Sequence, residues 1–405
     1  PRSHIGKVKA LVIAPQPFFS PRGTPFSVYY RTLIASELGV KMDLLTYGEG
    51  EDVNIKEVRI KRIPRFCSLG SVKIGPSYLK AFLDIFMLFW TIGLLIRNRY
   101  SFVHVHEEAV IFCRFLKPIF RFKLIYDMHS SLPQQLSNFQ FTKSKIIIGV
   151  FKILEDSCLK AADAVITICP DLSSYVKGII QDSRKHILIE NSIFEPVKLC
   201  STPRAENSRA SSPFETDDKT LKIPKGKKII VYTGTLEQYQ GIELLIDAFR
   251  ILLDDFQNAF LLVAGGNKDQ VSYYKNLASK RGIKERVHFT GQVGQALANH
   301  YCRLASVLVS PRTRGTNTPL KVYQQLASGI PLVATKISSH TQVLKNDVAF
   351  LVEPNPEAMA QGILQALSSE DDCKRMVQKA KTLYEEKYSR PVYERKMQEV
   401  LKMVA

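Results

Sequence analysis

Three basic side chains surround the point where a helix is predicted to begin: Arg312, Arg314 and Lys321. Thr318 is placed to cap this helix, Pro319 to occupy its first position, and Gly329 to end it. A helix N-terminus offers unbonded amides and the positive end of a dipole, so negative charge is stabilised there. The segment SPRTRGTNTPLKVYQQLASGIPLVAT, residues 310–335, therefore predicts a diphosphate site.

Short apolar strands alternating with amphipathic helices must position this segment. In the first half of the chain we expect strands at residues 9–13, 41–46, 58–63, 102–106, 123–126, 164–168 and 186–189. Helices are expected at residues 25–38, 77–96, 109–116, 143–161 and 170–179. Such alternation predicts a doubly wound parallel sheet with helices on both faces.

A second alternating series follows a change in composition. Residues 198–226 are rich in Ser, Pro and charge, which is typical of a linker or mobile loop. We expect strands at 228–233, 259–264, 287–290, 306–310, 331–335 and 349–352, with helices at 242–255, 270–280, 319–328 and 356–367. Two Rossmann-like halves with a cleft between them are predicted from this order.

The chain has 405 residues and a formal net charge of +18, so we expect two domains and anionic partners. Its seven cysteines are scattered and form no CxxC pair, which favours a reducing compartment without a structural zinc site. The apolar run at residues 81–96 is shorter than the roughly 20 residues that cross a bilayer. We favour a buried core helix there, while the flanking basic residues leave an interfacial helix open.

Several motifs in order resemble glycosyltransferase family 4, the retaining group 1 enzymes with the GT-B fold. They are PFFSPRGTPFSVYYRTLIASELG, FVHVHEEA, YDMHSSLP, ILIENSI, VYTGTLEQYQGIELLIDAF, FLLVAGG, VHFTGQV and residues 310–335. The resemblance covers about 350 residues. It implies an α/β chain of two Rossmann-like domains that face across a cleft, with a C-terminal helix crossing back.

The resemblance also implies the domain boundaries. Residues 1–197 would be the acceptor-binding domain and 198–226 the linker or mobile loop. Residues 227–385 would bind the nucleotide sugar, and residues 386–405 would form the crossover helix.

The implied reaction moves a sugar from a UDP- or GDP-linked donor to a hydroxyl of a lipid-linked or polysaccharide acceptor, with retention at the anomeric carbon. No metal or other cofactor is expected, because the helix start and basic side chains would neutralise the leaving diphosphate. The basic, apolar first half suggests an anionic membrane surface as a partner. We expect a cytoplasmic protein, peripheral on the inner face of the membrane, that does not bind nucleic acid.

Four positions depart from the family pattern. Members commonly carry two glutamates eight positions apart in the segment at 310–335, and those places are held here by Thr316 and Gln324. The arginine and lysine that clasp the diphosphate in the family are replaced by Thr235 and Gln240. Gln324 can still hydrogen-bond a ribose diol through its amide. The side chains of Arg312, Arg314, Lys321 and Arg22 are candidates to compensate for the lost charges.

By resemblance and position, we assign candidate site residues. The catalytic candidates are His129, Glu107 and Thr316. The donor-binding candidates are Gly23, Gly234, Thr235, Gly265, Arg312, Arg314, Gly315, Thr316, Asn317, Thr318, Pro319, Leu320, Lys321 and Gln324. The acceptor-binding candidates are Arg22, Glu108 and Asp127.

Each assignment has a structural alternative. Glu107 and Glu108 follow a strand and could instead cap the next helix, which is the simpler assignment. His104 and His106 alternate on one strand and so face one side, where a buried hydrogen-bonded pair is favoured over metal ligation. For the chain as a whole, the alternatives are a nucleotide-sugar epimerase, an inverting transferase, or a non-catalytic scaffold that has lost the two glutamates.

Overall fold

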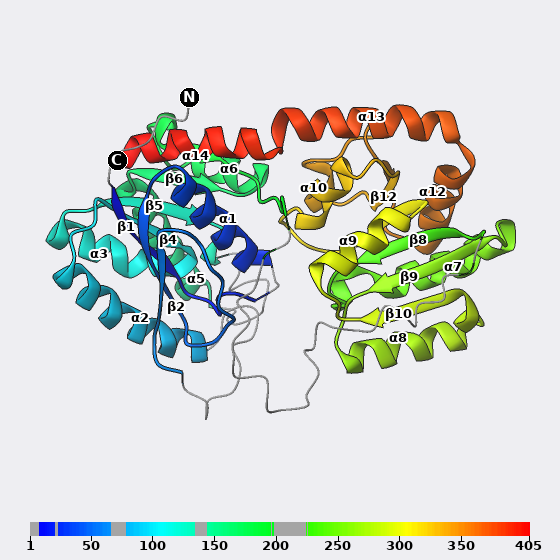
Figure 1. The fold of residues 1–405 in the computed structure, drawn as a ribbon, viewed down its shortest axis with the longest axis horizontal. Coiled ribbons are helices and arrows are strands. Elements are labelled where there is room, and N and C mark those ends of the chain that lie inside the picture. The colour runs from blue at the N-terminus through cyan, green and yellow to red at the C-terminus, as the bar shows by residue number, and fades with distance from the viewer. Residues whose placement is uncertain are drawn as a thin grey trace. The chain divides into compact units, whose positions relative to one another are not determined.

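The computed structural model describes residues 8–20, 23–65, 78–133, 144–195, 197, 224 and 226–405. These residues form two compact units (Figure 1). The first contains the described residues up to Asn191 together with Arg390–Ala405, and the second contains Ser192–Val197 and the described residues from there to Ser389. Arg22 and nearly all of the predicted linker, residues 198–226, lie outside the described residues.

The first unit is built on a seven-stranded parallel sheet with the order β3-β2-β1-β4-β5-β6-β7. The strands are β1 (Lys9–Ala14), β2 (Lys41–Thr46), β3 (Val58–Arg62), β4 (Phe102–His106), β5 (Lys123–Met128), β6 (Ala164–Thr167) and β7 (His186–Leu188). They lie within a residue or two of the predicted ranges, because buried apolar runs between turn residues mark parallel strands clearly.

Helices cover both faces of this sheet. One face packs against α2 (Tyr78–Arg97), α3 (Val110–Phe120), α5 (Lys145–Ala161) and α6 (Pro170–Lys177). The other face packs against α1 (Gly23–Glu37) and α14 (Arg390–Val404), so the last helix of the chain belongs to the first unit. Short 3₁₀ helices lie at Glu107–Ala109 and Ser183–Lys185.

The expectation of a buried core helix over residues 81–96 is wrong for most of that helix. α2 has 20 residues, and its buried side chains are Leu83, Met87, Thr91 and Leu95. These four recur every fourth residue and form one stripe. Partly buried residues beside the stripe also pack on the core, while the opposite side of this almost wholly apolar helix is exposed. By length and composition alone α2 could cross a membrane.

The second unit has a six-stranded parallel sheet with the order β10-β9-β8-β11-β12-β13. Its strands are β8 (Lys228–Thr233), β9 (Ala259–Ala264), β10 (Val287–Gly291), β11 (Val307–Ser310), β12 (Leu332–Thr335) and β13 (Phe350–Val352). Packed on one face are α7 (Ile242–Asp255), α8 (Lys268–Lys280) and α12 (Pro356–Ser368). Packed on the other are α9 (Gln295–Leu304), α10 (Leu320–Ala327) and α13 (Glu370–Lys387). A single-turn helix, α11 (Ser338–Thr341), and 3₁₀ helices at Gln238–Gln240 and Lys284–Arg286 complete the unit.

Two details of this unit differ from the predictions. The N-cap of α10 is Pro319 with an extended ψ of 135°, so Thr318 does not cap the helix and Pro319 does not begin it. The helix α9, with the sequence QALANHYCRL, was not predicted, although Leu297, Tyr301 and Leu304 recur at helical spacing; it is short and fully buries only Tyr301.

Both sheets are doubly wound, and in both the direction of strand succession reverses between the first and fourth strands. These strands are β1 and β4 in the first unit and β8 and β11 in the second. In open α/β sheets, ligands bind outside the carboxyl ends of the strands at such a reversal. The loops after these four strands are therefore where each unit is expected to bind its ligand.

Candidate functional site

In the second unit the loops after β8 and β11 pack against each other at the reversal of strand order. The amide of Thr313 donates a hydrogen bond of 2.9 Å to the carbonyl of Tyr239. Gly241 has φ +74°, and a β-carbon there would lie 1.9 Å from the carbonyl oxygen of Pro311. Only glycine permits this approach. The close packing brings the start of α10 beside the loop that ends β8.

Lys321 projects from the start of α10 to the end of β8. Its Nζ donates to the carbonyl of Thr233 at 3.2 Å and lies 3.8 Å from the centre of the Tyr232 ring. Burial, and then the neighbouring guanidinium of Arg312, lower the pKa of Lys321 to about 7. This lysine is therefore poorly compensated in the ligand-free unit, and an anion would favour its charged form.

Arg312 follows β11 and lies over the ring of Tyr239, with 5.1 Å between the guanidinium carbon and the ring centre. It donates to the carbonyl of Asn317 at 2.9 Å, while its buried Nε has no hydrogen-bond partner in the part of the chain that the structure describes. Burial lowers the pKa of Arg312. Among the described residues no carboxylate lies within 4.0 Å of the charged atoms of Arg312 or Lys321.

The remaining donor candidates of the 310–335 segment lie around these two cations. Arg314, Gly315 and Thr316 are exposed, and Asn317 to Lys321 are half-buried. The hydroxyl of Thr318 is buried and has no hydrogen-bond partner among the described residues. The amide of Gln324 also has no recorded protein partner there and lies half-buried on α10, three residues after Lys321.

Thr235 and Gln240 lie close together after the end of β8. By resemblance, they occupy the positions of the arginine and lysine that bind the diphosphate in the family. Gln240 donates from Nε2 to the hydroxyl of Thr235 at 3.4 Å, and its Oε1 is buried without a partner among the described residues. Gly234 and Gly265 close the strand ends: Gly265 has φ +133°, and a β-carbon there would lie 1.8 Å from the carbonyl oxygen of Gly234. Tight strand-to-loop turns thus account for these two glycines in the structure.

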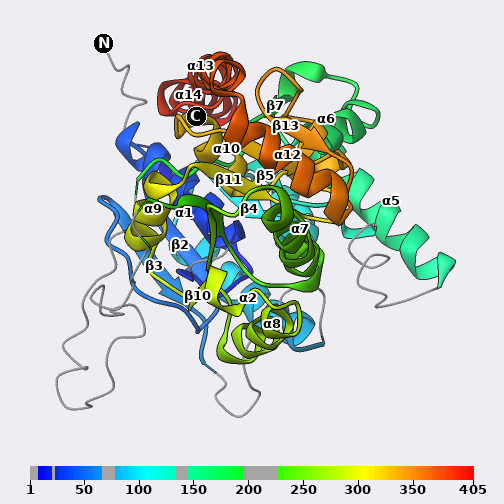
Figure 2. The same ribbon diagram turned by 90° about the vertical axis from the view of Figure 1, so that its right-hand side faces the viewer.

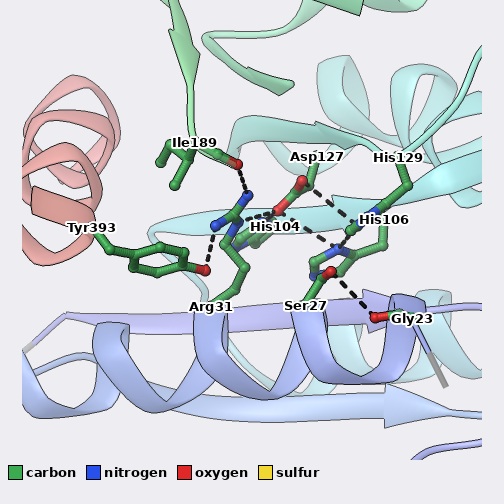
Figure 3. A network of polar contacts seen from close by, with 9 residues as sticks. All are labelled: Gly23, Ser27, Arg31, His104, His106, Asp127, His129, Ile189 and Tyr393. Atoms are coloured by element: carbon green, nitrogen blue, oxygen red, sulfur yellow. Dashed lines mark hydrogen bonds and ion pairs between the residues drawn. The ribbon is translucent and has the colours of Figure 1, made fainter. Parts of the chain in front are cut away.

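In the first unit a buried network lies under the carboxyl ends of β4 and β5 (Figure 3). Arg31 of α1 donates to Asp127 at 2.9 Å, to the carbonyl of Ile189 at 2.8 Å, and to the hydroxyl of Tyr393. Burial would raise the pKa of Asp127, but Arg31 and the nearby histidines outweigh burial and hold it well below its usual value. Asp127 is fully buried, which suits positioning of its neighbours.

Three histidines surround Asp127. His104 lies 3.1 Å from its Oδ2, and His106 and His129 share a hydrogen bond of 2.9 Å between Nδ1 and Nε2. His104 and His106 stack with 4.6 Å between ring centres, as expected for alternate residues of one strand. Burial lowers the pKa of His129 to about 4, although Asp127 opposes this, so its ring is neutral near pH 7. A neutral imidazole in this place can hydrogen-bond a sugar hydroxyl without adding charge.

Two of these histidines and the aspartate lie close enough together to share a metal ion, because ligand atoms of His104, His106 and Asp127 lie within 4.8 Å of one another. The guanidinium of Arg31, however, already occupies the carboxylate at 2.9 Å. A fixed positive charge at that distance opposes a second cation. We therefore interpret the group as a hydrogen-bonded network, in line with the prediction for the histidine pair.

Gly23 begins α1 and has open space where a β-carbon would be. Neither its backbone conformation nor its neighbours require glycine, in contrast to Gly241 and Gly265. Its place after β1, at the reversal of strand order, leaves room for a ligand beside the first turn of α1.

Glu107 and Glu108 do not cap the next helix, so the simpler assignment for them was wrong. The N-cap of the 3₁₀ helix is His106, and that of α3 is Ala109, which makes no side-chain cap. Instead the Nζ of Lys80 on α2 lies 2.6 Å from Glu108 and 3.8 Å from Glu107. Three carboxylates lie near this single lysine, and burial raises the pKa of Glu107 to about 7, partly opposed by Lys80.

Sequence reasoning missed Arg31, Tyr393 and the aromatic partners of the two cations. It assigned Lys80 to the basic flank of a possible interfacial helix and missed its ion pair with Glu108. A single arginine within the apolar stretch SVYYRTLIAS was the one available signal, since a buried charge needs a partner. The partners themselves are remote: Tyr393 lies 362 positions further along the chain. No local pattern identifies such a pair.

The chain is similar in sequence to known glycosyltransferases. Residues 213–383 match the family model described as glycosyl transferases group 1. An uncharacterized glycosyltransferase of Methanocaldococcus jannaschii is 25% identical over 307 residues, 74% of each chain. A phosphatidyl-myo-inositol mannosyltransferase of Mycobacterium leprae is 26% identical over 151 residues, 36% of this chain and 39% of its own.

Solved structures share the fold over nearly the whole chain. Sucrose-phosphate synthase of Thermosynechococcus elongatus superimposes with a TM-score of 0.72 and 17% identity, covering 98% of both chains. Anabaena HepE in complex with UDP gives a TM-score of 0.70 at 14% identity, covering 98% of this chain and 100% of its own. The predicted fold class is confirmed: the chain has the GT-B fold, and its residues 213–383 are similar to the glycosyl transferases of group 1.

Proposed function

We propose that the protein is a retaining glycosyltransferase of family 4 that uses a UDP- or GDP-linked sugar. The acceptor would be a hydroxyl of a lipid-linked glycan or a polysaccharide, at the cytoplasmic face of a membrane. Anabaena HepE is described with UDP and with UDP-glucose, and the mycobacterial relative is named for phosphatidyl-myo-inositol. These names support a nucleotide-sugar donor and favour a lipid-linked acceptor.

The observation that carries the proposal is the pair of poorly compensated cations in the second unit. Lys321 and Arg312 are partly buried, their pKa values are lowered, and no carboxylate among the described residues pairs with either. Holding such charges without an anion is costly, and a diphosphate supplies the missing charge. Both follow β11, and Lys321 reaches the end of β8, at the reversal of strand order where a doubly wound sheet binds nucleotides.

In this site the diphosphate would contact Lys321, Arg312 and the loop amides near Gly315. These groups would stabilise the negative charge that develops on the leaving diphosphate, so a metal ion is not required. Gln324 would hold the ribose hydroxyls through its amide, and Thr316 a hydroxyl of the donor sugar. Retention would follow if the leaving oxygen of the donor itself accepts the proton of the acceptor on the same face of the sugar.

The first unit would supply the groups that face the acceptor and the donor sugar. His129 would donate a hydrogen bond from its neutral ring, held in place by His106 and by Asp127 beneath it. Glu107, whose pKa is raised to about 7 by burial, is a candidate to bind or deprotonate a hydroxyl. Gly23 would leave space for the ligand at the start of α1.

A thermal-shift titration with UDP, GDP and their sugars tests the donor assignment. A diphosphate in excess should raise the unfolding temperature of the wild type, because a ligand that binds only the native state stabilises it. Lys321→Met should abolish most of the shift, and Lys280→Met, an exposed lysine of α8, should not. Equal shifts for the wild type and Lys321→Met would refute the assignment.

A non-catalytic scaffold is the second candidate, favoured by Thr316 and Gln324 in place of the expected glutamates. A scaffold would bind UDP without turnover, whereas an enzyme releases UDP from a UDP-sugar in the presence of acceptor. Product stereochemistry measured by NMR separates a retaining from an inverting transferase, and formation of an epimeric sugar nucleotide would indicate an epimerase.

A further inference from the structure

Three neighbouring helices of the first unit share an exposed apolar surface, which we call the α2–α3–α5 face. Of the fifteen large hydrophobic side chains that are exposed among the described residues, twelve lie on these helices. They are Tyr78, Phe82, Ile85, Phe89, Trp90, Ile96, Phe115, Ile119, Ile146, Ile147, Val150 and Ile153. α3 contacts both α2 and α5, so the three helices form one continuous layer on the sheet (Figure 1). Figure 2 shows α2 and α5 of this layer in a view turned by 90°.

The exposed residues follow the helical repeat. On α2 they recur at positions 78, 82, 85, 89 and 96, and on α5 at 146, 150 and 153. Each helix thus has a second apolar stripe opposite the stripe that packs on the sheet. With about half of the roughly 150–250 Å² of each large side chain exposed, twelve present on the order of 1,000 Å². Patches on soluble monomers seldom exceed about 300–600 Å².

The charges on this face are positive. Arg97 and Arg99 follow the exposed Ile96 at the end of α2, and Lys145, Lys152 and Lys160 lie on α5 beside its apolar stripe; all five are exposed. The acidic side chains of the three helices point elsewhere. Asp84 accepts a hydrogen bond from Tyr47 at 2.6 Å, and Glu155 and Asp156 both accept from Tyr175.

The geometry points to a lipid bilayer with anionic headgroups as the partner of the α2–α3–α5 face. Aromatic and aliphatic side chains would enter the headgroup and upper acyl region, and the flanking lysines and arginines would meet lipid phosphates. The apolar side chains of this face match the acyl region of a bilayer, and its basic side chains match the anionic headgroups. This inference deepens the membrane location in the proposed function by naming the surface and its partner.

α2 lies on the membrane in this arrangement and does not cross it. Its inner side is tied to the sheet by the ion pair of Lys80 with Glu108 and by the hydrogen bond from Tyr47 to Asp84. Its buried stripe belongs to the core shared with α3 and α5. Leaving that core to span a bilayer would carry Lys80 and Asp84 into hydrocarbon, which is far more costly than interfacial binding.

Vesicle sedimentation tests the inference. The full chain should sediment with vesicles of phosphatidylcholine and phosphatidylglycerol, and much less with phosphatidylcholine alone. The double variant Phe89→Ser/Ile153→Ser should lower partitioning by about tenfold or more, because two large side chains no longer enter the apolar phase. Tyr273→Ser, an exposed aromatic of α8 in the second unit, is the matched control and should bind as the wild type does.

A pair of charge-reversal substitutions measures the electrostatic contribution to vesicle binding. Lys145→Glu/Lys152→Glu should weaken binding to the anionic vesicles by roughly fivefold or more per charge and remove most of its salt dependence. The exposed Lys275→Glu on α8 is its control. The UDP-induced thermal shift, measured on every variant, should be unchanged. Phe89, Ile153, Lys145 and Lys152 lie in the first unit, and the control residues Tyr273 and Lys275 are exposed residues of α8 that the proposed donor site does not include.

Three results would overturn the inference: no sedimentation of the wild type at low salt, equal binding of wild type and Phe89→Ser/Ile153→Ser, or a dimer that those substitutions dissociate without any vesicle binding. The last would make the face an interface between two copies. If UDP does not raise the unfolding temperature of the wild type, the proposed donor site is refuted and the membrane inference is unaffected.

Discussion

The affinity of the second unit for UDP is predicted to fall steeply above pH 7, because Lys321 must be protonated to bind the diphosphate. Burial and Arg312 lower the pKa of this lysine to about 7 in the ligand-free protein. A bound diphosphate would return the pKa toward or above its ordinary value of about 10.4. Between these two pKa values, binding must take up a proton, so the observed dissociation constant rises with pH.

The magnitude follows from the fraction of lysine already protonated. The dissociation constant scales with 1 + 10^(pH − pKa), which is about 2 at pH 7 and about 100 at pH 9 for a pKa of about 7. The expected weakening is thus about fifty-fold, or about 2.3 kcal/mol. UDP itself contributes little in this window, because the second phosphate pKa is about 6.

Calorimetric titration in two buffers of different protonation enthalpy measures the effect directly. At pH 8 we expect uptake of about 0.9 protons per UDP bound. Lys321→Arg keeps the positive charge at every pH and should flatten the profile, since arginine does not deprotonate in proteins. Lys321→Met should also give a flat profile, with affinity at pH 7 lower by roughly tenfold or more.

The reasoning fails if the wild type shows the same affinity at pH 7 and pH 9, or no proton uptake at pH 8. Stability of the ligand-free protein gives an independent check of sign. The folded pKa of Lys321 lies below its unfolded value, so the unfolded chain binds more protons between about pH 7 and pH 10. This lysine should therefore make the second unit more stable as the pH rises through that range.

Three further predictions concern single side chains. Gln324→Ala should raise the KM for the donor more than any single substitution in residues 198–226, because the amide would lose its ribose hydrogen bonds; steady-state kinetics with an unchanged KM would contradict the assignment. Arg31→Met should lower the free energy of unfolding of the first unit by about 3–5 kcal/mol, measured by urea denaturation, since it leaves the buried carboxylate of Asp127 without its guanidinium partner; a second substitution, Asp127→Asn, should restore part of the loss. His129→Ala should lower kcat by about 10²-fold or more with little change in UDP affinity, and equal kcat values for variant and wild type would exclude a catalytic contact.

Most of the fold was predictable from local pattern. Strands such as β4 and β9 are continuous apolar runs between turn residues, and α7 and α12 have a regular apolar stripe. Such segments form the same element in almost any context, because local geometry and burial agree. The short helix α9 and the exact start of α10 depended on tertiary contacts, and prediction failed there.

The sequence by itself determined the two alternating series, the order of the family motifs, and the cluster of basic residues near α10. Those features depend on neighbours within one element or one turn, so periodicity and spacing are enough to recognise them. Tertiary structure decided which charges are buried and what they meet. Only folding brings Lys321 over Tyr232 and Arg31 to Tyr393.

The difference between local pattern and tertiary packing also explains α2, whose composition is that of a core helix. Hydropathy measures how apolar a segment is and cannot say which of its faces the rest of the chain covers. The rest of the first unit covers one side of α2, so Leu83, Met87 and Leu95 are buried while Phe89 and Ile96 remain exposed. Packing in three dimensions, set by residues far apart in the chain, made this helix part of a surface.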